Sequence, residues 1–119
     1  MALKILSIDD EPSITLLISA LLGTYGMEVI TANSGKHGLQ LFRAESPDLV
    51  LLDVMMPEMN GLEVCQAIRS FSNVPIIGFS ALSDQQQIDD ALKAGFNDFL
   101  EKPSSTETLV AHIHKLTAA

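Results

Sequence analysis

The sequence is poor in several residue types, and each shortage excludes a class of protein. Its 119 residues include one cysteine, one tyrosine and no tryptophan. A single cysteine cannot form a disulfide within the chain, and no Cys/His spacing typical of a zinc site is present. The lack of a disulfide framework fits a reducing compartment, so we expect a cytoplasmic protein.

Basic residues and long apolar runs are also scarce. Seven Lys and Arg residues stand against 15 Asp and Glu residues, which gives a formal net charge of −8. An acidic chain repels phosphate backbones, so we expect no direct nucleic acid binding. The apolar run near the N-terminus is too short for a signal peptide or a membrane span, and acidic residues follow it at once, so we expect no membrane insertion.

Apolar residues, in contrast, make up 47% of the chain. We therefore expect residues 1–119 to form a single domain with a substantial core. Short apolar runs recur roughly every two dozen residues, which is the length of a strand and a helix with their turns. Most are uninterrupted, as in strands that are buried on both faces. The predicted strands are Leu3–Ile8, Met27–Thr31, Leu49–Leu52, Val74–Phe79 and Asp98–Leu100.

Helical patterns lie between these runs. Apolar residues spaced i, i+3, i+4 and i+7 predict a first helix from Ile14 to Leu22, with Pro12 near its start and Gly23 near its end. A weaker pattern covers residues 34–45. The last three helices are predicted to begin at capping boxes, in which Asn or Ser precedes Glu or Gln by three residues: Asn60 with Glu63, Ser83 with Gln86, and Ser104 with Glu107.

Five successive βα units predict an α/β fold, specifically a flavodoxin-like (βα)5 three-layer sandwich with a parallel five-stranded sheet of order 2-1-3-4-5. Ligands of such sheets bind outside the carboxyl ends of the strands, where the order reverses between strands 1 and 3. Strand 2 ends in uncharged residues. The other four strands deliver polar or charged residues to this edge: Asp9 and Asp10, Asp53, Ser80, and Lys102.

Three of these residues, Asp9, Asp10 and Asp53, should converge because strands 1 and 3 are neighbours. Carboxylates so close repel one another, so the group should bind a hard divalent cation or retain a proton. Oxygen ligands of this kind favour Mg²⁺. With Lys102 and Ser80 nearby, the set suits phosphoryl transfer. Asp53, on the central strand, is then the expected nucleophile, and its attack on phosphorus would give an aspartyl phosphate.

Four motifs in order, "IDDEP", "LLDVMMPEMNG", "FSA" and "DFLEKP", resemble the receiver domain of two-component response regulators, whose stand-alone chemotaxis members share this size. The resemblance extends from Leu3 to the last helix. It implies that Asp53 accepts the phosphoryl group. It also implies that Asp10, Asp53 and the backbone carbonyl of Met55 bind Mg²⁺ directly, whereas Asp9 acts mainly through water.

The resemblance also assigns the switching residues. Lys102 would contact the phosphoryl group, with a cis bond to Pro103, and the Ser80 hydroxyl would swing toward it. Phe99 matches the aromatic switch, although many members have tyrosine there, and a plain core role for Phe99 is equally open. The face formed by the fourth helix, fifth strand and fifth helix would then change partners.

The implied partners are a sensor histidine kinase or a histidine phosphotransfer protein, and an unnamed output protein or domain. Whether phosphorylation causes dimerisation stays open. The sequence is also compatible both with a stand-alone regulator and with the receiver part of a longer chain.

Two other functions compete with the phospho-accepting switch. A phosphatase with an aspartyl phosphate intermediate would need a second acid two residues after Asp53, where this chain has Met55. A pseudo-receiver or flavodoxin-like binding module would not need the intact set of site residues. We therefore expect no enzyme beyond self-phosphorylation and self-dephosphorylation. The resemblance implies that the residues two beyond Asp53 and two beyond Ser80 influence hydrolysis of the phosphoryl group. Here these are Met55 and Leu82, which are apolar and orient water poorly, so we expect a long-lived phosphoryl group.

The remaining chemically distinctive residues are expected to be structural. A soft-metal site among the methionines and a metal site between the helix histidines are both disfavoured against packing and surface positions. In the third helix, Val64, Ile68 and Phe71 are expected to form the apolar face. The residues assigned to packing or to the surface are Met55, Met56, Met59, Cys65, His37, His112 and His114.

Overall fold

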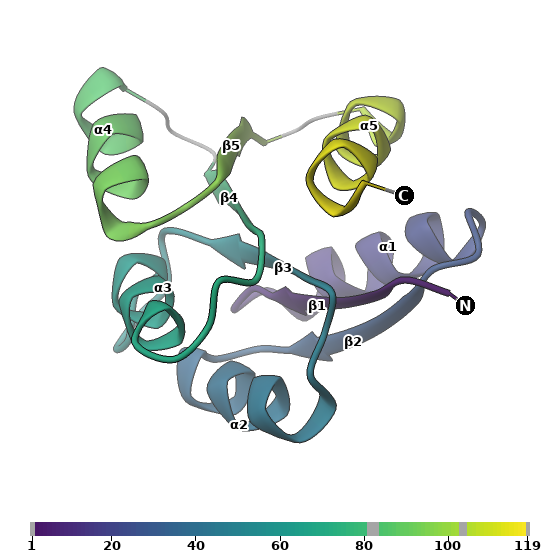
Figure 1. Cartoon of the computed structure of the whole chain (residues 1–119), viewed down its shortest axis with the longest axis horizontal. Helices are drawn as coiled ribbons and strands as arrows, with labels where there is room; N and C mark the ends of the chain where they lie inside the picture. Colours follow the sequence, from purple (N-terminus) through teal and green to yellow (C-terminus); the bar gives the residue numbers. More distant parts are fainter. Residues whose placement is uncertain (1, 81–83, 103–104, 119) are drawn as a thin grey trace.

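The computed structural model describes residues 2–80, 84–102 and 105–118. All strand pairs are parallel, and the sheet order is β2-β1-β3-β4-β5. Helices α1 and α5 cover one face of the sheet, and α2, α3 and α4 cover the other (Figure 1). The predicted flavodoxin-like sandwich is confirmed. The elements are β1 (Lys4–Ile8), α1 (Pro12–Gly23), β2 (Glu28–Ala32), α2 (Gly35–Glu45), β3 (Leu49–Asp53), α3 (Gly61–Arg69), β4 (Ile76–Ser80), α4 (Gln85–Ala94), β5 (Asp98–Glu101) and α5 (Thr106–Thr117).

The central strands are buried along their whole length, as their uninterrupted apolar runs predicted. Every residue of β3 and β4 is buried. Strand β4 begins at Ile76 rather than at the predicted Val74, because Pro75 has no N–H group to donate to the ladder. The Pro75 carbonyl still accepts a hydrogen bond of 3.0 Å from the Val50 amide.

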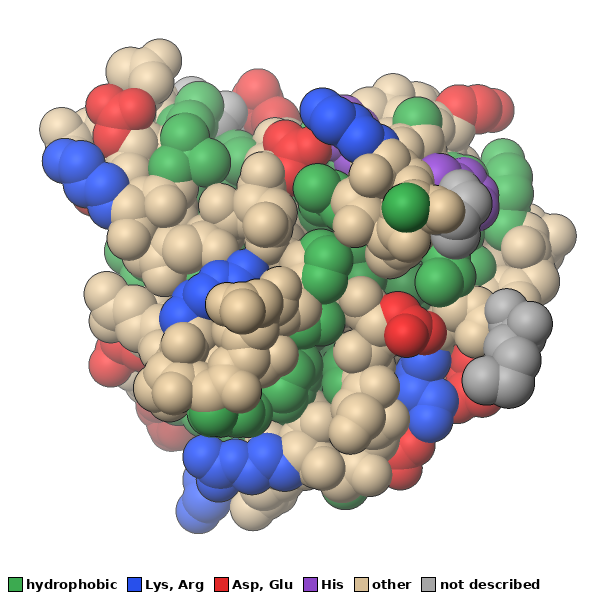
Figure 2. Space-filling model, in the orientation of Figure 1, with side chains coloured by type: hydrophobic (Ala, Val, Ile, Leu, Met, Phe, Trp, Pro, Cys, Tyr) green, Lys and Arg blue, Asp and Glu red, His purple; other side chains and the backbone are tan. Residues whose placement is uncertain are grey.

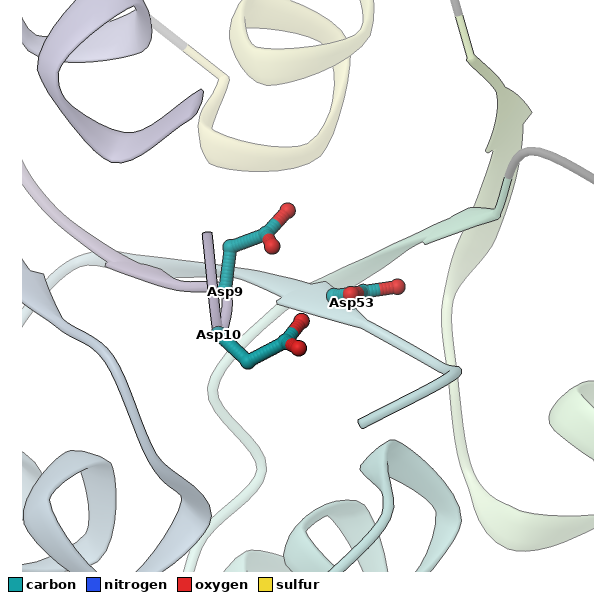
Figure 3. A group of neighbouring side chains, drawn as sticks. All are labelled: Asp9, Asp10 and Asp53. Carbon is teal, nitrogen blue, oxygen red and sulfur yellow. The ribbon is translucent and has the colours of Figure 1, made fainter. Parts of the chain in front are cut away.

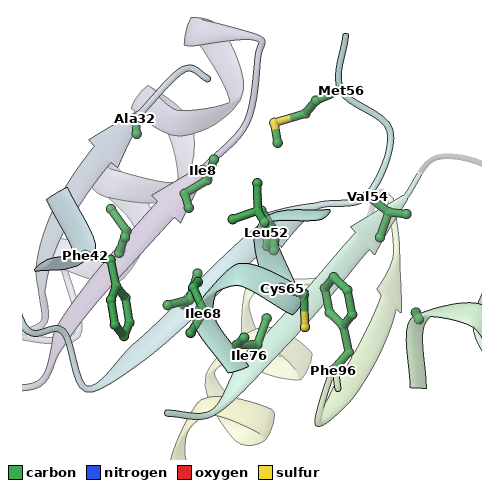
Figure 4. Close-up of a cluster of buried hydrophobic side chains, with 14 residues drawn as sticks. Ile8, Ala32, Phe42, Leu52, Val54, Met56, Cys65, Ile68, Ile76 and Phe96 are labelled. Atoms are coloured by element: carbon green, nitrogen blue, oxygen red, sulfur yellow. The ribbon is translucent and has the colours of Figure 1, made fainter. Parts of the chain in front are cut away.

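Two apolar layers pack against the sheet. The layer under α2, α3 and α4 includes Phe42, Ile68 and Phe96, which Figure 4 shows around the strands. The layer under α1 and α5 includes Leu22 and Ile113. These layers fix the strands, and the strands in turn fix the positions of the residues at their carboxyl ends.

The start of α3 lies directly against the end of β3. Gly61, the first residue of α3, donates its backbone N–H to the Val54 carbonyl at 3.0 Å. A Cβ atom at Gly61 would lie 2.7 Å from Cα of Val54, so only glycine fits this approach. The predicted capping box of Asn60 and Glu63 is confirmed, with both side-chain hydrogen bonds present.

The other two predicted capping boxes are wrong by one residue. Helix α4 is capped by Asp84, whose side chain accepts from the Gln87 amide at 2.7 Å. Helix α5 is capped by Ser105, which accepts from the Thr108 amide at 3.1 Å. The predicted caps, Ser83 and Ser104, lie outside the described residues. Two adjacent residues could cap each helix, and the structure uses the later one.

Leu17 and Phe71, which belong to the predicted apolar faces of the first and third helices, are exposed. Leu17 belongs to the apolar stripe of α1, yet it is 54% exposed, and its neighbour Leu16 is 69% exposed. Phe71 lies beyond the end of α3 and is 47% exposed. It packs edge-to-face on Phe42, with ring centroids 5.6 Å apart, and the Arg43 guanidinium lies 5.2 Å from its centroid.

The methionine and cysteine predictions are largely confirmed. Met56 and Cys65 are buried in the layer under α2, α3 and α4, and Met59 packs against that layer. The Cys65 thiol donates a hydrogen bond of 3.4 Å to the Ala94 carbonyl. Met55 differs from the packing prediction, because its side chain is 60% exposed.

The histidines are surface or near-surface residues. His37 and His114 are exposed, as predicted. His112 is half-buried instead, and its Nδ1 atom pairs with the Asp98 carboxylate of β5, a contact that the sequence did not predict. In Figure 2 acidic and basic side chains are interspersed on the visible face, without a basic stripe. Within the described ranges, no helix is both long and apolar enough to span a membrane.

Candidate functional site

Three carboxylates meet at the carboxyl edge of the sheet. Strands β1 and β3 are adjacent, and Ile8 pairs with Leu52 in their register. Asp9 and Asp10 directly follow β1, and Asp53 is the last residue of β3. A ligand oxygen from each carboxylate lies within 4.8 Å of the others, and Figure 3 shows Asp9 and Asp10 extending from β1 beside Asp53. The convergence predicted from the strand ends is confirmed.

Asp9 is held from several directions. Its Oδ1 atom accepts from the Glu11 amide at 3.1 Å, and its Oδ2 atom accepts from Lys102 Nζ at 2.6 Å. Its backbone carbonyl accepts from the Asn33 side-chain amide at 2.8 Å. The same Asn33 amide group donates to the Thr15 hydroxyl at 3.2 Å. The sequence did not predict this anchoring role of Asn33, which lies just after the second strand.

Asp53 is 5% exposed. Its Oδ1 atom accepts from the Met55 amide at 3.1 Å, and its Oδ2 atom lies 3.7 Å from Lys102 Nζ. Burial, followed by the charge of Asp9, raises the pKa of Asp53 to about 7, with a smaller contribution from Asp10. Lys102 and the Met55 N–H act in the opposite direction. Burial and the neighbouring acids therefore disfavour the charged form of Asp53 in the metal-free molecule.

Lys102 spans the site from the end of β5. Its backbone N–H donates to the Ser80 carbonyl at 2.8 Å, which fixes the ends of β4 and β5 together. Burial alone would lower the pKa of Lys102, but the hydrogen bond to Asp9 and the charges of Asp53, Asp9 and Glu11 raise it overall. The ammonium group therefore stays charged while it faces two carboxylates.

The carboxylate cluster fits a hard divalent cation. Asp9 and Asp53 are buried, and Asp10 is more exposed, so the group is open to solvent on one side. The donor set consists of oxygen atoms, which Mg²⁺ prefers, and a cation there would offset the repulsion that raises the pKa of Asp53. The Met55 amide donates a hydrogen bond to Asp53. That the Met55 carbonyl binds a metal stays a prediction.

The two predicted switch residues lie on neighbouring strands. Ser80 is buried at the end of β4, and its hydroxyl donates to Oε1 of Gln87 at 3.4 Å. Phe99 of β5 is half-buried and packs against the layer under α2, α3 and α4. It pairs in register with Gly78, where a Cβ atom would lie 3.2 Å from its ring. This packing is compatible with a core role and with a switch role.

Two further predictions and one unpredicted contact concern the surroundings of the site. The predicted cis bond to Pro103 and the position of Leu82 lie outside the described residues. Gln87 of α4, which contacts Ser80, was not predicted as a site residue. The only signal in the sequence was its place in the first turn of a helix that follows a strand end.

The sequence matches a family model described as the response regulator receiver domain over residues 5–114. The probable transcriptional regulator ycf27 of Cyanophora paradoxa is 43% identical over 113 residues, which cover 95% of this chain and 47% of that protein. The DNA-binding response regulator MtrA of Mycolicibacterium smegmatis is 36% identical over 113 residues, covering 95% of this chain and 50% of that protein. The chain thus spans about half the length of the curated relatives it matches.

Solved structures agree over almost the whole chain. The chemotaxis protein CheY4 of Vibrio cholerae superposes with a TM-score of 0.91 at 29% identity, covering 98% of this chain and 99% of that one. The BeF3-activated N-terminal receiver domain of Klebsiella pneumoniae RstA gives a TM-score of 0.93 at 29% identity, with the same coverage. Sequence match, sheet order and the carboxylate cluster agree, and the chain belongs to the response regulator receiver domain family of two-component signal transduction.

Proposed function

We propose that residues 1–119 form one receiver domain that accepts a phosphoryl group on Asp53. The observation that carries this proposal is the position of Asp53 at the end of the central strand, buried beside Asp9 and within 3.7 Å of the Lys102 ammonium. A surface carboxylate in a turn would have neither the burial nor the cationic neighbour. The phosphoryl donor is a histidine of a sensor kinase or of a phosphotransfer protein.

The transfer needs Asp53 in its ionised form. One carboxylate oxygen of Asp53 attacks phosphorus, an O–P bond forms, and the N–P bond to the donor histidine breaks. Lys102 is placed to attract an oxygen of the incoming group, because its ammonium lies between Asp9 and Asp53. Asp9, Asp10, Asp53 and the Met55 carbonyl would hold Mg²⁺, which supplies positive charge toward the phosphoryl oxygens.

Phosphorylation then acts as a switch. It places a group with strong acceptor oxygens beside Ser80, which can donate its hydroxyl proton to that group. Phe99 follows, and the face formed by α4, β5 and α5 changes its partners. The half-buried position of Phe99 supports this role, since a side chain at the margin of the core can change rotamer without opening a large cavity.

We infer an output outside this domain. The relative ycf27 is named as a probable transcriptional regulator and MtrA as a DNA-binding response regulator, and both are about twice as long. Control of transcription by the rest of a longer protein is therefore one proposed output. A stand-alone role, as in a chemotaxis protein of similar fold, is the other. This domain itself, with a net charge of −8, would act without binding nucleic acid. Its setting is the cytoplasm.

The domain would catalyse only its own phosphorylation and dephosphorylation. A phosphatase would need a general acid close to the aspartyl phosphate, and Met55 stands two residues after Asp53. A binding module that never takes up phosphate would not need a buried carboxylate whose pKa is raised to about 7 beside a lysine.

Incubation with acetyl phosphate and Mg²⁺, followed by intact-protein mass spectrometry, tests the proposal. The wild-type chain should gain one phosphoryl group, and Asp53→Asn should gain none. Glu58→Gln, which removes an exposed acid in the β3–α3 loop, should behave like the wild type. The absence of an adduct in the wild type would refute phosphorylation. Steady-state hydrolysis of phosphomonoesters would favour the phosphatase alternative instead.

A further inference from the structure

Three consecutive glutamines begin α4, and their side chains make different contacts. Gln85 donates to Asp89 at 2.9 Å, and Gln86 donates to Asp90 at 2.8 Å, so both bond to an acid one turn further along the same helix. The residue one turn beyond Gln87 is Ala91, which offers no acceptor side chain. Gln87 instead reaches out of the helix toward the strand ends.

Gln87 contacts two residues at the rim of the carboxylate site. Its Oε1 atom accepts from the Ser80 hydroxyl at 3.4 Å, and its Nε2 atom donates to the Met55 sulfur at 3.4 Å. Met55 in turn donates its backbone N–H to Asp53. One side chain of α4 therefore bridges the ends of β3 and β4, the two strands that carry Asp53 and Ser80.

The backbone of Gln87 lies in the first turn of α4. The Gln87 amide donates to the Asp84 side chain at 2.7 Å, which is the cap of α4. The cleft of about 590 Å³ next to it is lined by Met55, Leu62 and Gln87 among others. A displacement of Gln87 would therefore act directly on the first turn of α4, and open space is available for it.

We propose that Gln87 is a positioning residue that holds Ser80 in the unphosphorylated arrangement and couples its release to α4. This inference deepens the proposed function and rests on it. The reason is that a hydroxyl group has one proton, so a Ser80 hydroxyl that donates to a phosphoryl oxygen on Asp53 no longer donates to Gln87. Formation of that hydrogen bond breaks the one to Gln87, and the first turn of α4 loses its side-chain contact with the end of β4.

The test is the affinity for beryllofluoride in the presence of excess Mg²⁺, measured by isothermal titration calorimetry on the whole chain. Beryllofluoride binds a carboxylate and has the shape of a phosphoryl group. Gln87→Leu removes one acceptor that competes for the Ser80 proton, so it should bind beryllofluoride about two- to tenfold more tightly than the wild type, the range for one neutral hydrogen bond. Gln87→Met, of similar length, should shift the affinity in the same direction.

Two controls separate coupling from a general effect of the substitution. Gln85→Leu changes the same kind of side chain in the same turn and should bind like the wild type. In a Ser80→Ala background, Gln87→Leu should have no effect, because the proton for which Gln87 competes is gone. The Ile88 amide donates to the Asp84 carbonyl at 3.1 Å at the start of α4. In the wild type, beryllofluoride should also speed hydrogen exchange of this amide, and in Gln87→Leu the exchange should be fast from the start.

The outcomes distinguish the two proposals. An unchanged affinity in Gln87→Leu, or a change that persists in the Ser80→Ala background, would overturn the role of Gln87 while the phosphorylation of Asp53 stands. A wild-type chain that does not bind beryllofluoride at all would overturn the proposed function and the role of Gln87 with it.

Discussion

At the carboxyl edge of the sheet three carboxylates lie within reach of one another, whereas at the amino edge one guanidinium group meets three oxygen acceptors. Arg69 of α3 donates to the carbonyls of Gly95 and Ser72 at 2.9 and 3.2 Å, and to Oδ1 of Asn97 at 2.7 Å. The same Asn97 oxygen accepts from the Ile76 amide, which begins β4. At this edge the positive charge of Arg69 is matched by three hydrogen-bond acceptors.

The carboxyl edge is built in the opposite way. Lys102 pairs with Asp9 and lies near Asp53, yet burial and the neighbouring acids still raise the pKa of Asp53 to about 7. Unfavourable electrostatics of this kind lower stability and are typical of functional sites. The difference teaches that the amino edge favours stability, whereas the carboxyl edge gathers negative charge at a cost in stability, as the proposed cation-binding and reactive site would.

The largest expected change in the free energy of unfolding comes from a substitution at the amino edge. Arg69→Ala should lower the free energy of unfolding by about 2–4 kcal/mol, because it leaves half-buried carbonyl groups without their charged donor. Arg43→Ala is the matched control. The Arg43 guanidinium lies over the exposed ring of Phe71, so this substitution should cost less than about 1 kcal/mol. Urea denaturation measures both. Equal effects of the two substitutions would contradict the role given to Arg69.

At the carboxyl edge a substitution should have the opposite sign. Asp53→Asn should raise the free energy of unfolding of the metal-free protein at about pH 8 by roughly 1–3 kcal/mol, because it removes an unfavourable buried charge. The pKa of Asp53 is raised from 3.8 to about 7, so its ionisation lowers wild-type stability as the pH rises from about 4 to about 7 and adds no further loss above that range.

Urea denaturation across this pH range, in the presence of a chelator, tests the sign. The stability of Asp53→Asn should fall less steeply with pH than that of the wild type. Glu58→Gln, at an exposed acid, should follow the wild-type curve. A destabilised Asp53→Asn at alkaline pH would show that the carboxylate is favourably placed even without a cation.

Metal addition should sharpen the contrast between the edges. Millimolar Mg²⁺ should stabilise the wild type by about 1 kcal/mol through binding to the folded state, and Asp10→Asn should reduce the effect. The stabilisation should be smaller at about pH 6 than at about pH 8, because protons compete for Asp53. Thermal denaturation with and without the metal measures it. A pH-independent gain, or one retained in Asp10→Asn, would place the metal elsewhere.

The smallest expected effect concerns the lifetime of the phosphoryl group. Met55→Asn puts a polar side chain two residues after Asp53, where it can orient water, and should speed dephosphorylation several-fold, which is about 1 kcal/mol in the barrier. Met55→Leu, which stays apolar, should decay at the wild-type rate. Loss of the phosphoryl group is followed by mass spectrometry after removal of the donor. Identical decay in both variants would show that this position does not control hydrolysis.

The sequence predicted those features that depend on local pattern and topology. Uninterrupted apolar runs indicated the buried strands, and the parallel order brought Asp9, Asp10 and Asp53 to one edge. The capping box of Asn60 was correct because no other residue beside it can cap. At α4 and α5 the caps are Asp84 and Ser105, each the second of two adjacent residues that can cap a helix, and the local pattern alone does not choose between them.

Contacts between distant segments could not be predicted from the sequence. The hydrogen bond from Asn33 to the Asp9 carbonyl spans 24 residues, and the contacts of Arg69 to Gly95 and Asn97 depend on how α3 meets the α4–β5 turn. Leu17 is exposed because the α1 stripe is wider than the face that the sheet covers. These outcomes follow from the relative placement of elements, which periodicity does not encode.

The most direct test of the central claim is to locate the phosphoryl group in the chain. Borohydride reduces an aspartyl phosphate to homoserine, so the protein is treated with acetyl phosphate and Mg²⁺, reduced, digested and sequenced by mass spectrometry. The account predicts homoserine at position 53 and nowhere else, with none formed when Mg²⁺ is chelated. Unmodified Asp53 together with phosphate on another residue, such as the exposed His37, would contradict it.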